Sequence, residues 1–462
     1  MSVLPDSPLS LWLDAYGDYE PRPALAGRLE VDVAVIGGGF TGLSTAIALK
    51  RADPALSVAV LEAMTVGYGA SGRNGSFAMT VVGLGFGTTA MIRGKKFLQR
   101  AHSYMEGCVD TLEAFIDDEG LACDKIRPGF LRVATTPSYV KRLQKQVELM
   151  KSLGFEGIDW IDAGETCAMV NSERYLGAMW EPRLLLVDPA KLVREERRVA
   201  LGLGVEVYED TPVLAIASTE AYGAPAGGFR LLTPEGSVSA AKIAFCTNAY
   251  SHLFPDLAHK QVPAFTYMVA TEPLSDEQLA PIGWQGEQGL EDARNLIHYY
   301  RLTPDRRIVM GGGPVGLTPG VSLDADSDES AWRHLEDHIH WLWPHLSDVR
   351  VTHRWGGPFS VTMDLTPAMG SVGQPGRAAY SLGCIGHGVS MSYRNGQVLA
   401  ALLLDRDADL IEDCPFVNRR VVPWPAEPLA TAAKYTLREY LRAEDAFNEK
   451  VLAAGLPGLS RL

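Results

Sequence analysis

The sequence has few cysteines and no long apolar run. Its 6 cysteines are widely spaced and form no Cys-x-x-Cys pair, which argues against a zinc site and against a dithiol redox centre. Uninterrupted apolar runs stay shorter than the roughly eighteen residues that a membrane-spanning helix needs. The first residues lack a basic stretch followed by an apolar core, so we expect no cleaved signal peptide and a cytoplasmic location.

Positive charge is also scarce, because 42 lysines and arginines stand against 56 acidic residues and give a formal net charge of -14. Such a chain repels polyanions, which argues against nucleic acid as a partner and mildly favours a cationic small-molecule substrate. With 462 residues, the chain is long enough for two domains with separate cores.

The N-terminal part contains a strand, a glycine-rich turn and a helix in direct succession. Residues 31–36 form a short apolar run typical of a buried parallel strand, and Gly37-Gly38-Gly39-Phe40-Thr41-Gly42 follows at once. Residues 41–50 predict a helix, and residues 57–63 predict a second strand with Glu62 at its end. This order predicts a βαβ unit whose helix N-terminus can bind the pyrophosphate of a dinucleotide.

Each glycine of this turn has its own role in the expected site. Gly37 permits the tight turn, Gly39 lets the backbone approach a pyrophosphate, and Gly42 lets helix and strand pack closely. Glu62 is placed to accept hydrogen bonds from the adenosine ribose. The alternative is a plain structural turn with Glu62 as a solvated strand end. The motif alone does not distinguish FAD from NAD.

Two further glycine-rich segments favour FAD. Residues 67–76 follow soon after Glu62, and residues 383–388 precede a helix-like run that ends at Leu404. A second helix N-terminus aimed at the pyrimidine edge of a flavin would stabilise the negative charge that gathers there on reduction. In the alternative, a nicotinamide-linked dehydrogenase, both segments would have no role.

The rest of the chain indicates a second sheet and further helices. Short strands separated by turns between about residues 256 and 345 are typical of an antiparallel sheet. We expect the stretch after Asp405 to wrap the surface as a partly helical extension. The strands are predicted at residues 264–271, 296–302 and 307–310, and the helices at 98–118 and 139–153, with another helix opened by Asp188-Pro189.

Several segments together resemble one family, the D-amino-acid oxidase, glycine oxidase and sarcosine oxidase superfamily. Residues before the first strand and in the second glycine segment most resemble the gamma-glutamylputrescine oxidoreductases within it. The segments are the N-terminal fingerprint, residues 71–75, Thr247-Asn248, residues 362–370 and 386–388, with residues 10–13 and 22–25 for the narrower likeness.

The resemblance implies an α/β fold with two domains. The first is a Rossmann-like FAD-binding domain that is discontinuous in the sequence, and the second is an α+β substrate domain built on an antiparallel sheet. The expected FAD-binding domain comprises residues 29–105, 180–255 and 346–405, the substrate domain residues 106–179 and 256–345, and the extensions residues 1–28 and 406–462.

The resemblance also implies the residues that hold FAD. Relatives that attach the flavin covalently use a cysteine before the Thr362 region or a histidine in the 67–76 loop, and this sequence has neither, so we expect non-covalent FAD. The implied cofactor residues are Gly37, Gly39, Phe40, Thr41, Gly42, Glu62, Ala63, Gly69, Ser71, Gly72, Arg73, Asn74, Gly75, Val213, Thr247, Asn248, Gly386, His387 and Gly388.

Three departures from the family concern the substrate. The arginine that clamps the carboxylate in glycine and D-amino-acid oxidases corresponds to Phe359, and a second arginine of glycine oxidase corresponds to Gly386. Ser390 stands where sarcosine oxidases carry a lysine. Because bidentate recognition of an α-carboxylate needs such cationic donors, an α-amino acid is a poor candidate substrate.

Two tyrosines are candidates for the wall of the substrate pocket. His298 and Tyr300 share one face of a predicted strand, whereas Tyr299 and Arg301 share the other, and one of these faces should look at the flavin. The resemblance suggests Tyr267 and Tyr300 for this wall. Packing within the sheet is the open alternative for both.

Arg73 and His387 are the other catalytic candidates. Arg73 and Asn74 are open to two interpretations. They either approach the flavin or the substrate, or they bind the protein backbone or the pyrophosphate. His387 either acts as an acid or base or spaces a helix N-terminus through its backbone. His338 and His340 lie two residues apart on a predicted helix and so do not share a face, and we expect no metal site.

We therefore expect a flavoenzyme that oxidises the carbon–nitrogen bond of a primary or secondary amine, with a polyamine conjugate or an amine with a distal anion among the candidate substrates. A neutral nitrogen lone pair would assist hydride transfer from the adjacent carbon, giving an imine that water hydrolyses to an aldehyde. The resemblance implies O2 as acceptor, with H2O2 as product. Two alternatives stay open: oxidation of a D-amino acid or N-methyl amino acid held by Arg73 or Arg301, and a flavin-binding electron-transfer subunit without its own amine substrate.

Overall fold

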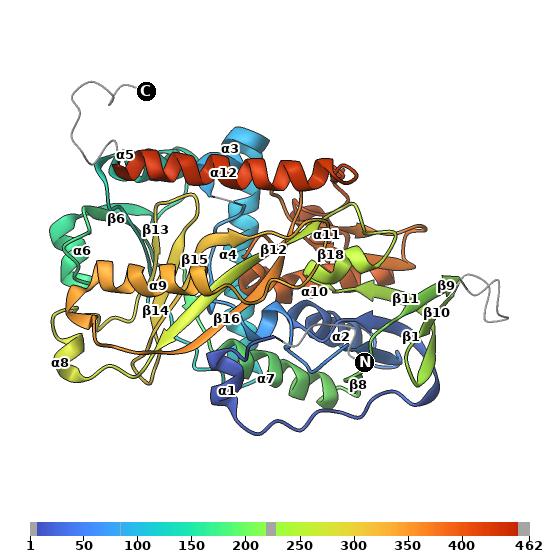
Figure 1. The fold of residues 1–462 in the computed structure, drawn as a ribbon. Coiled ribbons are helices and arrows are strands. Elements are labelled where there is room, and N and C mark those ends of the chain that lie inside the picture. The colour runs from blue at the N-terminus through green and yellow to red at the C-terminus, as the bar shows by residue number, and fades with distance from the viewer. Residues whose placement is uncertain (1–6, 84, 219–227, 451–462) are drawn as a thin grey trace.

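A computed structural model describes residues 7–83, 85–218 and 228–450. Two eight-stranded sheets organise the molecule, and helices cover them (Figure 1). This is the mixed α/β architecture that the sequence predicts, with one sheet mainly parallel and the other mainly antiparallel.

The first sheet has the strand order β17-β18-β11-β1-β2-β8, and β10 and β9 extend it from β11 as antiparallel strands. β1 has parallel partners on both sides, β11 and β2, which explains why its second half is a continuous buried apolar run. The strands are β1 (Gly27–Ile36), β2 (Val58–Leu61), β8 (Glu206–Tyr208), β9 (Ala215–Ser218), β10 (Phe229–Leu232), β11 (Gly236–Phe245), β17 (Ala368–Ser371) and β18 (Ala378–Leu382).

One layer of helices packs on this sheet and forms the largest core. It consists of α2 (Phe40–Ala52), α4 (Lys95–Asp118), α7 (Pro189–Gly202) and α10 (Gly388–Leu404). α2 and α10 approach closely where Gly396 lies against Ser44, since a Cβ on Gly396 would come within 2.6 Å of the Ser44 backbone. The predicted helix after Asp188 is α7, and the Asp188 side chain caps it by accepting from the Lys191 amide.

The second sheet has the order β16-β12-β15-β14-β13-β4-β6-β5, and all its neighbouring strands are antiparallel except β13 and β4. Its inner strands carry the three strands predicted between residues 264 and 310. The strands are β4 (Phe130–Val133), β5 (Asp159–Asp162), β6 (Gly177–Glu181), β12 (Val262–Thr271), β13 (Gly289–Asp292), β14 (His298–Leu302), β15 (Ile308–Gly316) and β16 (Val351–Val361).

The two faces of the second sheet have different neighbours. One face packs against α9 (Glu329–Leu342), where Trp332, Leu335 and Ile339 are buried. The opposite face contributes Met268 and Trp355 to a core shared with Trp12 near the N-terminus. This second face is the one directed at the first sheet, and it therefore borders the space between the two sheets.

Two elements differ from the predicted domain boundaries. α4 continues through the boundary predicted at residue 105, because its apolar stripe from Met105 to Phe115 packs in the first core. β16 belongs to the second sheet, where Met268 pairs with Trp355, although residues 346–405 were expected in the FAD-binding domain. Amphipathic and paired elements stay whole, so the change of domain occurs in the segments that join them.

Residues 406–450 form the predicted partly helical extension. The long helix α12 (Leu429–Lys450), red in Figure 1, runs beside α5 (Pro137–Ser152) across the molecule. The remaining elements are α1 (Leu11–Tyr16), α3 (Phe86–Arg93), α6 (Ala163–Met169), α8 (Asp276–Leu279), α11 (Ala408–Asp413), β3 (Phe77–Ala78) and β7 (Leu185–Leu186).

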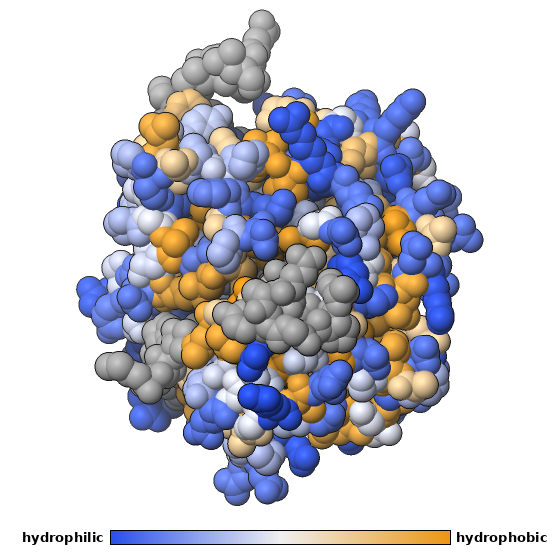
Figure 2. All heavy atoms as spheres, turned by 90° about the vertical axis from the view of Figure 1, so that its right-hand side faces the viewer, coloured by the Kyte–Doolittle hydropathy of each residue, from blue (hydrophilic) through white to orange (hydrophobic). Residues whose placement is uncertain are grey.

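The surface mixes polar and apolar side chains. Hydrophilic residues are spread over the face in Figure 2 and alternate with smaller hydrophobic areas, as on most folded proteins. Among the helices that the structure describes, none is both long and apolar enough to cross a membrane.

Candidate active site

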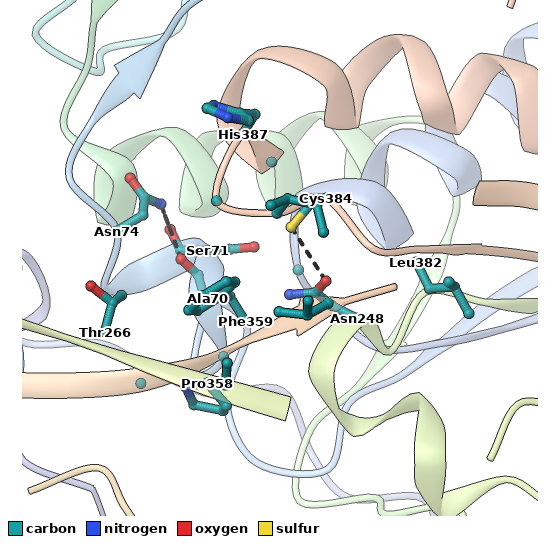
Figure 3. Close-up of a pocket in the computed structure, with 18 of the residues that line it drawn as sticks. Ala70, Ser71, Asn74, Asn248, Thr266, Pro358, Phe359, Leu382, Cys384 and His387 are labelled. Atoms are coloured by element: carbon teal, nitrogen blue, oxygen red, sulfur yellow. Dashed lines mark hydrogen bonds between the residues drawn. The ribbon is translucent and has the colours of Figure 1, made fainter. Parts of the chain in front are cut away.

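A cavity of about 430 Å³ lies between the two sheets. It begins at the carboxyl ends of the parallel strands β1, β2, β11 and β18, the edge at which α/β sheets usually bind ligands. It continues along the second sheet, where residues of β12, β14 and β16 line it. Figure 3 shows part of this cavity, with Asn74 and Ser71 from one segment and Pro358 and Phe359 from another.

The glycine turn after β1 has the backbone geometry that a phosphate site needs. Gly37 has φ +106°, and a Cβ on Gly37 would come within 2.7 Å of the Cys246 carbonyl. A Cβ on Gly42 would come within 1.9 Å of the Gly37 carbonyl, so the turn closes only with glycine at both places. α2 then starts at Phe40, after a glycine that has no side chain to cap it, and its first residues Phe40 and Thr41 line the cavity.

Glu62 follows β2 and lines the same part of the cavity. Its carboxylate accepts hydrogen bonds from the Gly38 amide at 2.6 Å and the Met64 amide at 3.0 Å. These bonds fix the carboxylate beside the glycine turn. Burial, which outweighs them, raises the pKa of the Glu62 carboxyl to about 7.

The segment from Gly67 to Ser76 wraps the start of α2. Ser71 Oγ accepts from the Phe40 amide at 3.0 Å, which ties this segment to the helix N-terminus. The Asn74 side chain holds the segment in shape: its amide nitrogen donates to the carbonyls of Ala70 and Ser71 (Figure 3), and its oxygen accepts from the Ser76 amide. The segment is therefore a rigid wall of the cavity.

Arg73 is buried, and two of its three guanidinium nitrogens donate to backbone carbonyls. Its Nε donates to the Tyr68 carbonyl at 2.9 Å and its Nη1 to the Gly356 carbonyl at 3.0 Å, while Asp326 lies 3.5 Å away. Only 5% of the side chain is exposed. Arg73 lines the cavity but serves chiefly to join the 67–76 segment to β16.

The N-terminus of a second helix, α10, also borders the cavity. It lies on the other side of α2. The turn before α10 has Gly386 at φ +83°, and His387, the N-cap residue, turns its side chain to the Gly83 carbonyl at 2.9 Å. Since a carbonyl only accepts, His387 Nε2 carries a hydrogen there. Burial lowers the pKa of His387 to about 4, so the ring is neutral at pH 7.

The second sheet supplies the opposite wall. Thr266 and Tyr299 line the cavity, and their hydroxyl oxygens lie 3.3 Å apart. Glu291 pairs with Tyr299 across β13 and β14, and Arg132 pairs with Glu291 across β4 and β13, so these side chains share one face. Phe359 of β16 completes this wall (Figure 3).

Arg132 and Glu291 form a buried ion pair within this wall. The Arg132 guanidinium donates from Nη2 to the Glu291 carboxylate, and the two side chains are 6% and 2% exposed. Burial raises the pKa of Glu291 above its usual range although Arg132 opposes this shift. Arg132 Nε has no hydrogen-bond partner among the described residues, so the pair is incompletely satisfied.

Comparison with known proteins agrees with this arrangement. The sequence model of the family described as FAD dependent oxidoreductase (DAO) matches residues 32–402. The chain is 31% identical over 431 residues to gamma-glutamylputrescine oxidoreductase of Escherichia coli (strain K12), covering 92% of this chain and 96% of that protein.

The chain belongs to the FAD-dependent oxidoreductase family. It is also 24% identical over 379 residues to sarcosine oxidase subunit beta of an Arthrobacter species, covering 79% of this chain and 82% of that one. The fold is similar to that of glycine oxidase from Geobacillus kaustophilus, with a TM-score of 0.70 at 20% identity, covering 85% of this chain and all of that one.

The residues present fit FAD. Two helix N-termini and two glycine turns meet at one cavity, and Glu62 is held beside the first turn. Of the residues predicted for the cofactor, Gly42 and Gly72 lie behind the cavity wall, where Gly42 packs on Gly37 and Gly72 on Gly67. The others line the cavity: Gly37, Gly39, Phe40, Thr41, Glu62, Ala63, Gly69, Ser71, Arg73, Asn74, Gly75, Val213, Thr247, Asn248, Gly386, His387 and Gly388.

The structure places Tyr267 and Tyr300 away from the cavity, contrary to the expectation that they wall it. Both are buried in the core under α9, where the Tyr267 hydroxyl donates to the Ala325 carbonyl and the Tyr300 hydroxyl bonds that of Tyr175. Alternation in β14 instead turns Tyr299 to the cavity. The alternation in the sequence assigned these residues to two faces of the strand. Nothing in the sequence indicated which of the two faces lines the cavity.

Glu291 and Arg132 were missed by sequence reasoning. They lie 159 residues apart in the chain, and each occupies a short strand with no motif around it. Only the parallel pairing of β4 with β13 brings them together. Ser390, the third departure from the family, lies within α10 and donates to the His387 carbonyl at 3.2 Å.

His338 belongs to a cluster that the helix spacing did not suggest. Ligand atoms of Asp292, His298 and His338 lie within 4.8 Å of one another, because β13 and β14 bring two residues to α9. The His298 and His338 rings stack with their planes 12° apart and their centroids 3.9 Å apart. The absence of a metal site stays a prediction.

Proposed function

We propose that this FAD-dependent oxidoreductase oxidises the CH–NH bond of an amine, with FAD bound non-covalently. The bound FAD would accept the hydride of the carbon next to nitrogen. The C–H electron pair leaves with that hydride, the nitrogen lone pair forms the C=N bond of an imine, and water converts the imine to an aldehyde and the released amine. O2 is the proposed final acceptor, reduced to H2O2.

The wall formed by Phe359, Tyr299 and Glu291 is the observation that carries this proposal. It offers one carboxylate and apolar or hydroxyl-bearing side chains, which suit an ammonium group on an alkyl chain. An α-carboxylate would need a free arginine at the same wall. Phe359 stands there instead, and Arg132 is already paired with Glu291.

The arginines available to an amino acid substrate are engaged elsewhere. Arg73 donates to the carbonyls of Tyr68 and Gly356. Arg301, 2% exposed, donates to the carbonyls of Val187 and Leu302 and lies outside the cavity lining. The hydrogen bonds of Arg73 and the position of Arg301 outside the cavity lining both count against a D-amino acid or N-methyl amino acid as substrate.

Glu291 has a specific role in this proposal. An alkylamine enters largely as the ammonium ion, whereas hydride transfer needs its neutral lone pair. Glu291 binds the ammonium and takes one proton from it. Its raised pKa suits an acceptor that must hold this proton while Arg132 keeps the carboxylate in place.

An anaerobic screen of substrate classes tests the proposal. The purified flavoprotein is mixed with primary amines, N-alkyl amines, D-amino acids and N-methyl amino acids, and bleaching of the flavin band near roughly 450 nm is followed. We expect reduction by amines that lack an α-carboxylate. Reduction by α-amino acids alone would overturn the proposal, and a flavin reduced by none of these compounds would favour an electron-transfer subunit.

A further inference from the structure

The end of the cavity that α12 covers has a mostly apolar lining, which we call the apolar segment. Its residues come from β12, β15, β16, the stretch after β11 and the C-terminal extension. None of them is among the residues predicted to hold FAD, so the apolar segment is space for the substrate. Its apolar lining residues are Leu253, Phe254, Val262, Val315, Leu317, Val361, Trp424, Leu437 and Leu441.

Contacts join these side chains into one surface. Val262 and Trp424 pack in one core cluster, with Val361 against it, and Trp424 Nε1 donates to the Val361 carbonyl at 3.0 Å. The Tyr435 hydroxyl of α12 donates to the Leu317 carbonyl at 3.0 Å, which fixes the helix on the end of β15. The apolar segment is therefore a continuous wall made by the second sheet and the C-terminal extension together.

Two cations line the apolar segment, and their hydrogens are largely engaged by the protein. Lys434, 4% exposed, donates two hydrogens of Nζ to backbone carbonyls just after β15. Arg438 donates from Nη1 to the Val315 carbonyl and from Nε and Nη2 to the Glu439 carboxylate. A second ammonium group of a substrate would be repelled here, and a carboxylate would have to displace a partner of Arg438.

Charge and exposure together set the direction of an amine in the cavity. Glu291 is the carboxylate at the wall of the second sheet, whereas Lys434 and Arg438 carry positive charge beside the apolar segment. Leu253 and Leu437 line the cavity and are also 51% and 36% exposed, so they lie where it opens to solvent. An ammonium group is therefore drawn inward to Glu291, with its carbon chain towards α12 and the opening.

We propose that the apolar segment binds the hydrocarbon chain of the amine substrate. This inference rests on the proposed amine oxidation and narrows its substrate class to monoamines with an uncharged alkyl or arylalkyl body. The ammonium group lies at the wall of Glu291 and Tyr299, and the chain runs along the apolar segment to α12. Each methylene group that moves from water onto this surface strengthens binding.

Primary n-alkylamines of increasing chain length test the proposal. The flavoprotein is mixed anaerobically with each amine from propylamine to octylamine, and stopped-flow measurement of flavin bleaching gives a limiting rate and an apparent Kd. We expect the apparent Kd to fall about two- to fourfold for each added methylene until the chain reaches the opening. The limiting rates should stay close to one another, because the reacting carbon does not change.

Two further probes report on the far end of the chain. An α,ω-diamine and an ω-amino acid of matched length place an ammonium or a carboxylate where octylamine places its methyl group. We expect an apparent Kd at least about tenfold higher for both than for octylamine, since a charged end loses water to an apolar surface. Tighter binding of the ω-amino acid than of octylamine would overturn the proposal and indicate an anion site.

The variant Leu437→Asn and its control Leu429→Asn locate the effect at α12. Leu437→Asn is expected to raise the apparent Kd of octylamine about fivefold and to leave that of propylamine unchanged. Leu429, on the same helix, is 64% exposed and outside the cavity lining, so Leu429→Asn should keep both values. Flavin content and thermal melting of each variant report whether it folds.

The outcomes separate this inference from the proposed function. If amines reduce the flavin but the apparent Kd does not depend on chain length, or Leu437→Asn keeps the whole dependence, the apolar segment does not bind the chain and amine oxidation stands. If no amine reduces the flavin, amine oxidation is refuted, and this inference with it.

Discussion

Gly42 is a residue at which the backbone leaves no space for a side chain. A Cβ there would overlap the Gly37 carbonyl, so Gly42→Ala must open the turn that presents N–H groups to the pyrophosphate. We expect FAD affinity to fall at least tenfold, measured by flavin content after purification and by titration of the apoprotein with FAD. Gly202→Ala, where a Cβ meets nothing within 4 Å, should bind FAD normally.

Glu291 is the residue on which the proposed substrate chemistry depends. Glu291→Gln keeps the shape and removes the charge, so we expect the apparent Kd of the amine in flavin reduction to rise about tenfold or more. The wild-type reduction rate should fall as Glu291 becomes protonated at low pH, and the variant should lack this limb.

Glu181 offers a matched control, since it is buried on β6, which is separated from β13 by β4, and is absent from the cavity lining. Glu181→Gln should leave the apparent Kd of the amine unchanged.

Because Glu291→Gln leaves Arg132 buried without its partner, the double variant Arg132→Met with Glu291→Gln should recover stability but not amine binding. An unchanged Kd in Glu291→Gln would contradict the role of this carboxylate.

At the residue scale the sequence predicted the cofactor end of the cavity better than the substrate end. Glycine turns are local motifs, because their glycines lie within a few residues of one another, as Gly42 against the Gly37 carbonyl shows. Tyr299 and Glu291 depend on which face of a sheet turns inward, and that is decided by packing against α9 and α1, far away in the sequence. Local pattern carries no information on that choice.

The helix α7 carries a buried carboxyl, Glu196, that makes stability depend on pH. It is fully buried, and neither of its oxygens has a hydrogen-bond partner among the described residues. Burial raises its pKa well above the usual range, so the folded chain keeps a proton that the unfolded chain loses above about pH 4.5. The free energy of unfolding therefore falls as pH rises through this window.

Glu196→Met removes this proton uptake. We expect the variant to gain stability over the wild type as pH rises from about 5 to 8, by up to about 1.4 kcal/mol per pH unit, in chemical unfolding curves of the flavoprotein. Glu195→Met, on the side of α7 where Glu195 pairs with Arg198, should not gain stability with pH. A stability difference that is constant with pH would contradict the account.

The helix α12 is joined to the cavity by Asp445. Its carboxylate accepts from the amides of Asn295 and Leu296, and also bonds the Tyr139 hydroxyl. Asp445→Ala leaves these buried donors unpaired, which costs about 1–3 kcal/mol for each lost partner. We expect faster hydrogen exchange in residues 293–297 and a lower melting temperature. Unchanged exchange in these residues would show that α12 is anchored elsewhere.

Element boundaries followed from the sequence where periodicity or capping was strong, as at Asp188 and the start of α7. The domain boundary predicted at residue 105, by contrast, falls within a continuous helix. α4 is one amphipathic helix, and its sequence pattern does not change at residue 105. The role of α12 was also not predicted, because a helix after a family's common region gives no local sign of what it covers.

The whole molecule places a dinucleotide site and a substrate wall on two sheets that face each other. The parallel sheet lines the cavity with the glycine turns that fit FAD, and the antiparallel sheet lines it with the residues to which the proposed function assigns the substrate. The cavity between them is closed by α12, whose sequence is separate from both. In the proposed function, cofactor binding and substrate choice therefore depend on different parts of the chain.

An anaerobic single turnover tests the central claim most directly. The flavoprotein is mixed with a primary amine, and the bleached flavin and the aldehyde formed are both counted. We predict one aldehyde for each flavin reduced and a slower reduction when the carbon next to nitrogen carries deuterium. Reduction without aldehyde, or a flavin that amines leave oxidised while an α-amino acid or NADH bleaches it, would contradict the account.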